Sequence, residues 1–290
     1  MSPNAPDVVI VGAGVVGCNT AWHLHQRGLR VAVVEARETA AAQATDGAAG
    51  FVASWSGFYL VGFGKTEWEM QQYGKEFYRR FAVGRAEEIG FRDCGIAFAY
   101  LDPAVWESLQ GPIEESRRWG TRWEVLSRER AAELLPEIRF DQVAAVLFEP
   151  DAVRVRAGDA IRAMAGRLAD DGVRFAYDTR VTGFRQAGDR VIGVTTDRGE
   201  LLASHVIVTA GAWSRPLVEG LGIPCPANPR PTARYTTRPL PGVRPDLPLI
   251  IFPSYRDHTF YIREQQGGLL IGGGRRGQTD RKSTRLNSSH

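Results

Sequence analysis

The feature that most constrains the fold is a glycine-rich turn after the apolar run VVIV at residues 8–11. Four small residues follow this run: Gly12, Ala13, Gly14 and Gly17. Gly12 permits a tight turn, Gly14 lets the backbone approach a phosphate, and Gly17 lets a helix pack closely on a strand. The pattern predicts a buried strand that turns sharply into a helix over residues 15–27.

An acidic residue completes this pattern at the end of the next apolar run, VAVVEA. Glu35 lies about 20 residues beyond the turn, where it can accept hydrogen bonds from a ribose diol. Amides at the start of the helix, including that of Val16, can bind phosphates without a basic side chain. The pattern predicts a Rossmann-type α/β domain that binds FAD or NAD, since a carboxylate disfavours the 2′-phosphate of NADP. For the glycines alone, a tight turn in a buried sheet is the alternative.

Composition limits the remaining possibilities. The chain has 290 residues, 43% of them apolar, which favours two interleaved domains over one. No apolar run reaches the roughly 18 residues needed to span a bilayer, and residues 1–7 lack the features of a signal peptide. Cys18, Cys94 and Cys225 are scattered, which indicates a reducing, cytoplasmic location and neither a metal site nor a disulfide framework.

The last stretch differs from everything before it. Residues 280–290, DRKSTRLNSSH, resemble the translation of a sequencing adapter, which encodes all of them in one frame. We expect an artefact appended to a truncated reading frame. The stretch has three cations and one acid, a net +2 of the formal +3, so the rest of the chain is nearly neutral. The apparent basicity therefore gives no indication of binding to nucleic acid or to membranes, and no nucleic-acid partner is expected.

A run of small residues, TAAAQATDGAAGFVAS, follows Ala36 and Arg37. Here the chain resembles the FAD-dependent amino acid oxidoreductases of the D-amino acid oxidase, glycine oxidase and sarcosine oxidase superfamily. In that family an acid and a nearby arginine precede a loop of the type GASxxxAG, which passes from the pyrophosphate to the isoalloxazine. The resemblance implies that Thr45 binds phosphate and that Ala49 and Gly50 lie along the flavin. Gly47 stands where some members carry a histidine or arginine, so the FAD is expected to be non-covalent.

A second motif, VIVTAGAWS at residues 206–214, resembles the family pattern VVxAAGxWS. A parallel strand that ends without a bulky side chain can lie against the flavin or its ribityl chain. The resemblance implies cofactor contacts from Ala210, Gly211 and Trp213. It also implies a main-chain contact to adenine from Val181, in DTRVTGF.

The resemblance implies a discontinuous FAD-binding domain, residues 1–80 and 143–222, whose final segment is missing. The interleaved α+β substrate domain takes residues 81–142 and 223–279. Alternating side chains and edge prolines after residue 222 predict an antiparallel sheet with one face available to a ligand.

The implied reaction is oxidation of the C–N bond of an amino acid or N-methylated amine. The cofactor accepts the hydride from the α-carbon, and the imine product hydrolyses. The protein supplies orientation, usually through an arginine that grips a carboxylate. Tyr261, Arg263 and His258, in HTFYIRE, are the candidates. A structural ion pair is the alternative for Arg263, and a solvated turn is the alternative for His258.

One departure concerns the electron acceptor. The sarcosine oxidase branch has a lysine over the flavin in the hairpin that corresponds to GGLLIGG, but Leu270 occupies that position here. The arrangement of the sarcosine oxidase branch is therefore not expected, which favours another electron acceptor, although oxygen stays an alternative. No oligomeric state is predicted. The alternatives to amine oxidation are a nucleotide-binding fragment without turnover and another flavoenzyme class, such as a hydroxylase.

Overall fold

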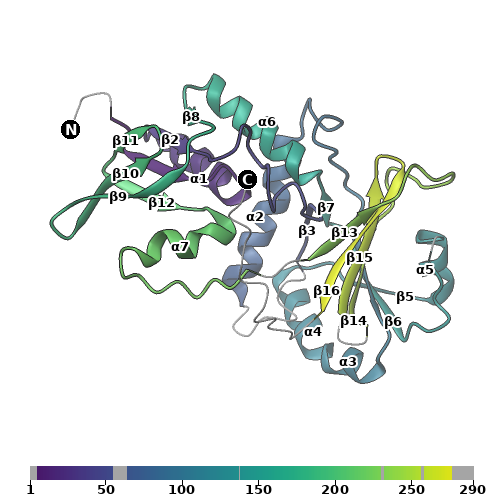
Figure 1. Ribbon diagram of the computed structural model, residues 1–290. Coiled ribbons are helices and arrows are strands. Elements are labelled where there is room, and N and C mark those ends of the chain that lie inside the picture. The colour runs from purple at the N-terminus through teal and green to yellow at the C-terminus, as the bar shows by residue number, and fades with distance from the viewer. Residues whose placement is uncertain (1–4, 55–63, 137, 230–231, 256–257, 276–290) are drawn as a thin grey trace. The chain divides into compact units, whose positions relative to one another are not determined.

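The computed structural model describes residues 5–54, 64–136, 138–229, 232–255 and 258–275 (Figure 1). The chain divides into two compact units. Unit 1 comprises Met1–Gly50, Phe81–Phe91 and Val155–Arg230, and unit 2 comprises Phe51–Arg80, Arg92–Arg154 and Pro231–His290. The expected artefact at residues 280–290 lies outside the described residues.

Unit 1 is built on a four-stranded parallel sheet in the order β12-β1-β2-β8. Its strands are β1 (Val8–Val11), β2 (Val31–Val34), β8 (Arg174–Ala176) and β12 (His205–Val208). Every residue of β1 and β2 is buried, as expected for parallel strands covered on both faces. The helices α1 (Val15–His25) and α6 (Ala157–Asp170) pack together beside this sheet. The predicted Rossmann-type α/β fold is confirmed.

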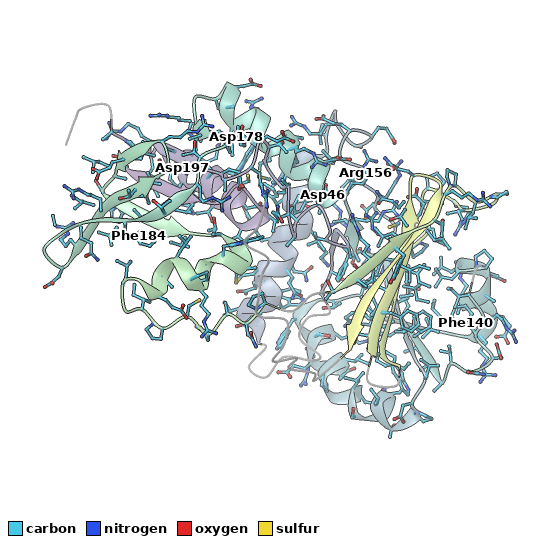
Figure 2. All side chains as sticks on the ribbon, viewed as in Figure 1. Asp46, Phe140, Arg156, Asp178, Phe184 and Asp197 are labelled. Atoms are coloured by element: carbon cyan, nitrogen blue, oxygen red, sulfur yellow. The ribbon has the colours of Figure 1, made fainter. Side chains whose placement is uncertain are left out.

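A small antiparallel sheet completes unit 1. It has the order β11-β10-β9, from β9 (Val181–Ala187), β10 (Arg190–Thr196) and β11 (Gly199–Leu202). Its buried side chains join those of the parallel sheet in one apolar cluster, to which Phe184 on β9 also packs (Figure 2). A short 3₁₀ turn, Gly211–Trp213, and helix α7 (Ser214–Glu219) follow β12.

Unit 2 contains a seven-stranded sheet in the order β13-β16-β15-β14-β4-β6-β5. The strands are β4 (Ile96–Tyr100), β5 (Glu124–Leu126), β6 (Ala145–Glu149), β13 (Ala233–Thr236), β14 (Leu249–Tyr255), β15 (His258–Gln265) and β16 (Gly268–Arg275). The sheet is antiparallel as predicted, except that β14 and β4 pair in parallel. These two strands come from distant segments of the chain, so no tight turn forces them to run in opposite directions. One face carries an apolar core that includes Phe140 (Figure 2).

The helices of unit 2 are α2 (Lys65–Phe81), α3 (Pro103–Ser108), α4 (Gln110–Trp119) and α5 (Arg128–Leu134). Side chains cap two of them: Asp102 accepts from the Ala104 amide (2.9 Å) and Ser127 from the Arg130 amide (3.2 Å). A two-stranded ribbon, β3 (Phe51–Val52) with β7 (Val153–Arg154), completes the unit. Among the described residues, none of the helices is both long and apolar enough to cross a bilayer.

The unit boundaries differ from the ranges that the sequence suggested. Residues 51–80 and 143–154 group with unit 2, and residues 81–91 and 223–230 group with unit 1. Side-chain contacts explain the first difference, because Lys75 of α2 is paired with Glu149 of β6, a strand inside the seven-stranded sheet. Neither the pairing of β6 nor the partner of Lys75 is visible in the local sequence pattern.

Candidate functional site

The sequence motifs of unit 1 converge on one cavity of about 400 Å³. Its lining comes from the glycine turn, from residues 34–45, from residues 179–181 and from residues 209–217. Eleven of the predicted cofactor residues line it: Gly12, Gly14, Val16, Glu35, Ala36, Arg37, Thr45, Val181, Ala210, Gly211 and Trp213. The other four, Ala13, Gly17, Ala49 and Gly50, lie outside this lining.

Two glycines of the turn are required by close backbone contacts. Gly12 has φ +105°, and an added Cβ there would lie 2.7 Å from the Thr209 carbonyl oxygen. A Cβ at Gly17 would lie 1.9 Å from the Gly12 carbonyl oxygen. Gly17 therefore acts behind the cavity, by letting α1 pack against the end of β1, as the sequence pattern predicts.

Thr45, a residue of the cavity lining, caps the start of α1. Gly14 is the N-cap residue and has no side chain to cap the helix. The buried Thr45 hydroxyl instead accepts a hydrogen bond from the Val15 amide (3.0 Å). Because this oxygen acts as an acceptor, its proton is available to an anion at the helix N-terminus. A phosphate would find both a hydroxyl donor and helix amides here.

Glu35 connects the two loops at the adenosine end of the predicted site. One carboxylate oxygen accepts from the Ala13 amide (2.8 Å) and the other from the Arg37 amide (2.9 Å). A carboxylate has about four lone-pair sites, so two remain for the hydroxyls of a ribose diol. The backbone thus sets the orientation of Glu35.

Thr209 is a site residue that the sequence motifs did not single out. Its hydroxyl donates to the carbonyl oxygens of Val11 (2.9 Å) and Gly12 (3.1 Å), which joins the ends of β12 and β1. This contact sets Ala210 and Gly211 beside the glycine turn. The only sequence signal is a hydroxyl side chain at the end of the apolar run VIVT.

The cavity residues fit an adenine dinucleotide. The glycine turn leaves space that a Cβ would fill, while Thr45 and Glu35 supply one donor and one acceptor group beside it. Nearby Cys18 is fully buried, and burial, followed by the charge of Glu35, raises the pKa of its thiol to about 12. Cys18 is therefore an inert thiol. Within the described residues, no cluster of three or more His, Cys, Asp or Glu side chains could hold a metal ion.

In unit 2, two of the three predicted substrate residues share one face of β15. Tyr261 lies opposite Gly272 of β16, and Arg263 lies opposite Leu270. Arg263 is only 2% exposed. Its Nη1 donates to the Glu264 carbonyl oxygen (3.1 Å), but its Nε has no hydrogen-bond partner in the part of the chain that the structure describes. Burial, and then the charge of Arg154, lowers the pKa of Arg263 to about 10.

The carboxylate of the adjacent residue, Glu264, is already paired with other groups. Its Oε2 pairs with Arg154 Nη2 (2.7 Å) and its Oε1 accepts from the Gly267 amide (2.8 Å). Arg154 also donates to the Pro245 carbonyl oxygen (2.8 Å). Among the described residues the ion pair of this cluster therefore belongs to Arg154, and Arg263 adds a buried positive charge without a carboxylate of its own.

Tyr261 adds a hydroxyl beside this charge. Burial raises the pKa of the half-buried Tyr261, although the charges of Arg234 and Arg263 oppose that effect. The hydroxyl therefore stays protonated near neutral pH and can donate a hydrogen bond. The backbone of His258 begins β15, but its side chain lies outside the described part of the chain.

Comparison with known proteins agrees with this geometry. A family model described as FAD dependent oxidoreductase matches residues 7–289. The 4-methylaminobutanoate oxidase (formaldehyde-forming) of Paenarthrobacter nicotinovorans is 27% identical over 272 residues, 93% of this chain and 32% of that protein. The mitochondrial pyruvate dehydrogenase phosphatase regulatory subunit of Mus musculus is 26% identical over 277 residues, 93% of this chain and 30% of that protein. The chain thus spans about a third of the length of these relatives.

A solved structure shows the same fold at lower identity. The L-proline dehydrogenase from P. horikoshii has a TM-score of 0.80 and 21% identity, over 93% of this chain and 70% of that one. The resemblance drawn from the glycine motifs is confirmed, and so is FAD as the cofactor of the family. Since the family model covers nearly the whole sequence, this chain belongs to the FAD dependent oxidoreductase family.

Proposed function

We propose that the chain oxidises the C–N bond of an amino acid or N-methylated amine with non-covalent FAD. When bound, FAD supplies the hydride acceptor for the α-carbon, and the resulting imine hydrolyses in water. Unit 1 is the FAD-binding domain in this proposal, and unit 2 is the substrate domain. We also propose a cytoplasmic location, which three free cysteines support.

In this proposal, different residues of the cavity bind different parts of FAD. Thr45 and the first amides of α1 bind the pyrophosphate, and the carboxylate of Glu35 accepts from the ribose diol. Val181 contacts the adenine, and Ala210 and Gly211 approach the flavin end. That these segments line one cavity supports the assignment.

In this proposal, the buried guanidinium of Arg263 binds the carboxylate of the substrate. A buried cation without a counter-ion is costly, and a substrate carboxylate would supply that counter-ion. Within the part of the chain that the structure describes, the Nε of Arg263 has no hydrogen-bond partner, and the Tyr261 hydroxyl can add a second hydrogen bond. The relative's substrate, 4-methylaminobutanoate, has both a carboxylate and a methylated amine, which supports an N-methylated amino acid here.

The first experiment asks which amines reduce the bound flavin. Purified protein is mixed under argon with 4-methylaminobutanoate, sarcosine, glycine, proline or D-alanine, and the flavin absorbance is followed. We expect bleaching by at least one of these acids and none by N-methylpropylamine, which lacks the carboxylate. Formaldehyde release would identify oxidation of an N-methyl group. A yellow protein that none of the five acids reduces would refute the proposal.

Arg263 offers a test that separates substrate binding from structure. We expect Arg263→Met to raise KM about tenfold or more, because a charge-assisted hydrogen bond contributes about 1.5–3 kcal/mol. The same substitution should leave the free energy of unfolding equal or higher, since it removes an uncompensated buried charge. Arg139→Met, whose side chain is 89% exposed, is the control. If Arg263→Met destabilised the fold and left KM unchanged, Arg263 would be a structural residue.

The electron acceptor is part of the same proposal. Leu270 is fully buried in β16, and the two lysines of the described chain, Lys65 and Lys75, each form an ion pair. Oxygen or another electron acceptor takes the electrons, and comparison of rates under air with rates in the presence of a redox dye distinguishes the two.

A second candidate function is nucleotide binding without turnover. The similarity to a regulatory subunit, at 26% identity, favours it. It predicts a protein that binds FAD and is reduced by none of the amines tested.

A further inference from the structure

The ring of Tyr261 lies over an α-carbon that has no side chain. Tyr261 of β15 is the direct cross-strand partner of Gly272 of β16. An added Cβ at Gly272 would lie 2.3 Å from the Tyr261 hydroxyl oxygen and 2.4 Å from Cζ. The far end of the ring therefore occupies the place of the missing side chain.

The backbone itself does not require glycine at this position. Gly272 is absent from the residues with positive φ, unlike Gly273, whose φ is +157°. Its surroundings within 3 Å of an added Cβ are atoms of Tyr261 alone. The Tyr261 ring is thus the physical reason for a glycine at 272.

The ring position decides where the Tyr261 hydroxyl lies. The end of the ring lies over Gly272 of β16, whose other cross-strand partner is Arg234 of β13, and the charge of Arg234 acts on Tyr261. The Tyr261 hydroxyl forms no hydrogen bond with any described residue. Arg263 lies two positions along β15 on the same face. The hydroxyl and the guanidinium are therefore two donors that one carboxylate could engage.

We propose that Gly272 is a positioning residue for substrate binding: by lacking a side chain, it seats the Tyr261 hydroxyl where it donates to the substrate carboxylate beside Arg263. This proposal rests on the proposed carboxylate site. Any side chain at 272 lifts the ring off β16 and moves the hydroxyl away from that site. Gly272 thereby sets the preference for substrates that carry a carboxylate.

The test compares two alanine substitutions on the same strand. Gly272→Ala collides with the Tyr261 ring, whereas an added Cβ at Gly274 meets only Thr232 Cγ2, at 3.4 Å. We expect Gly272→Ala to raise KM for 4-methylaminobutanoate about tenfold with kcat nearly unchanged, because a binding hydrogen bond is lost. Tyr261→Phe should match it, and Gly274→Ala should stay within about twofold of the parent.

A double-mutant cycle shows whether Gly272 acts through the ring. In a Tyr261→Leu background, Gly272→Ala should cause no further rise in KM, since no ring remains to be displaced. Additive effects would overturn the proposal, as would a Gly272→Ala variant that is less stable but has an unchanged KM. If Gly272→Ala does not fold, the Tyr261→Leu/Gly272→Ala protein must fold; if it does not, the collision argument is wrong. If Tyr261→Phe and Arg263→Met both leave KM unchanged, the carboxylate site itself fails.

Discussion

Loss of the Lys75 amine would leave a carboxylate buried without a counter-ion. Lys75 Nζ lies 2.7 Å from Glu149 Oε1, and the two side chains are 4% and 0% exposed. Ser54 completes the cluster: its amide donates to Glu149 Oε2 (2.8 Å) and its hydroxyl donates to Glu149 Oε1 (2.7 Å). The ion pair joins α2 to β6, and Glu149 also binds Ser54, which follows β3. Lys75→Met therefore tests how unit 2 is stabilised.

The magnitude follows from the burial of both partners. Removal of one partner from a buried ion pair costs about 3–5 kcal/mol, most of it from the charge that remains. Glu149 keeps its two hydrogen bonds from Ser54, so we expect the lower end of that range, about 3 kcal/mol. Lys75→Met/Glu149→Gln should recover most of this loss, because a neutral amide is far less costly to bury than a carboxylate.

The assay is urea unfolding, followed by far-UV circular dichroism. Lys65→Met is the matched control, since Lys65 lies on the same helix and is paired with Glu69 at a surface where the side chains are 62% and 54% exposed. We expect the control to change the free energy of unfolding by less than about 0.5 kcal/mol. If Lys75→Met is as stable as Lys65→Met, or if the double variant is no better than Lys75→Met, the argument from buried charge is wrong.

Two further predictions concern unit 1. Gly17→Ala sets a Cβ 1.9 Å from the Gly12 carbonyl oxygen, so we expect at least about tenfold weaker FAD binding in a fluorescence titration. Gly166→Ala is the control, because its added Cβ has no atom within 4 Å, and it should stabilise α6 by about 0.5–1 kcal/mol. Equal FAD affinity of the Gly17→Ala and Gly166→Ala variants would contradict this reasoning. Burial, and then the charge of Glu35, raises the pKa of Cys18 from 9.0 to about 12, so the stability due to the neutral thiol is complete below pH 9 and is lost between pH 9 and 12. Cys18→Ala should lose less stability than the parent between pH 8 and 10 in urea unfolding, and identical losses would refute the shift.

The sequence by itself determined the features that depend on local backbone chemistry. The glycine turn after β1 was predictable, because a tight turn and close strand–helix packing permit only glycine at its key positions. The acid at the end of β2 was predictable, because a ribose diol requires a hydrogen-bond acceptor about 20 residues beyond the turn. The antiparallel β15–β16 hairpin was equally predictable from its alternating side chains. These signals depend on residues that are near one another in the chain.

Only the tertiary structure decided which distant groups meet. The Thr209 hydroxyl joins two strand ends, Glu264 pairs with Arg154 rather than with Arg263, and α2 belongs with unit 2 through Lys75. Each outcome depends on competition among partners far apart in sequence, and burial decides that competition because it makes an unpaired charge or donor costly. Local sequence patterns do not report that cost, so it became visible only in the folded chain that Arg263 has no carboxylate partner among the described residues.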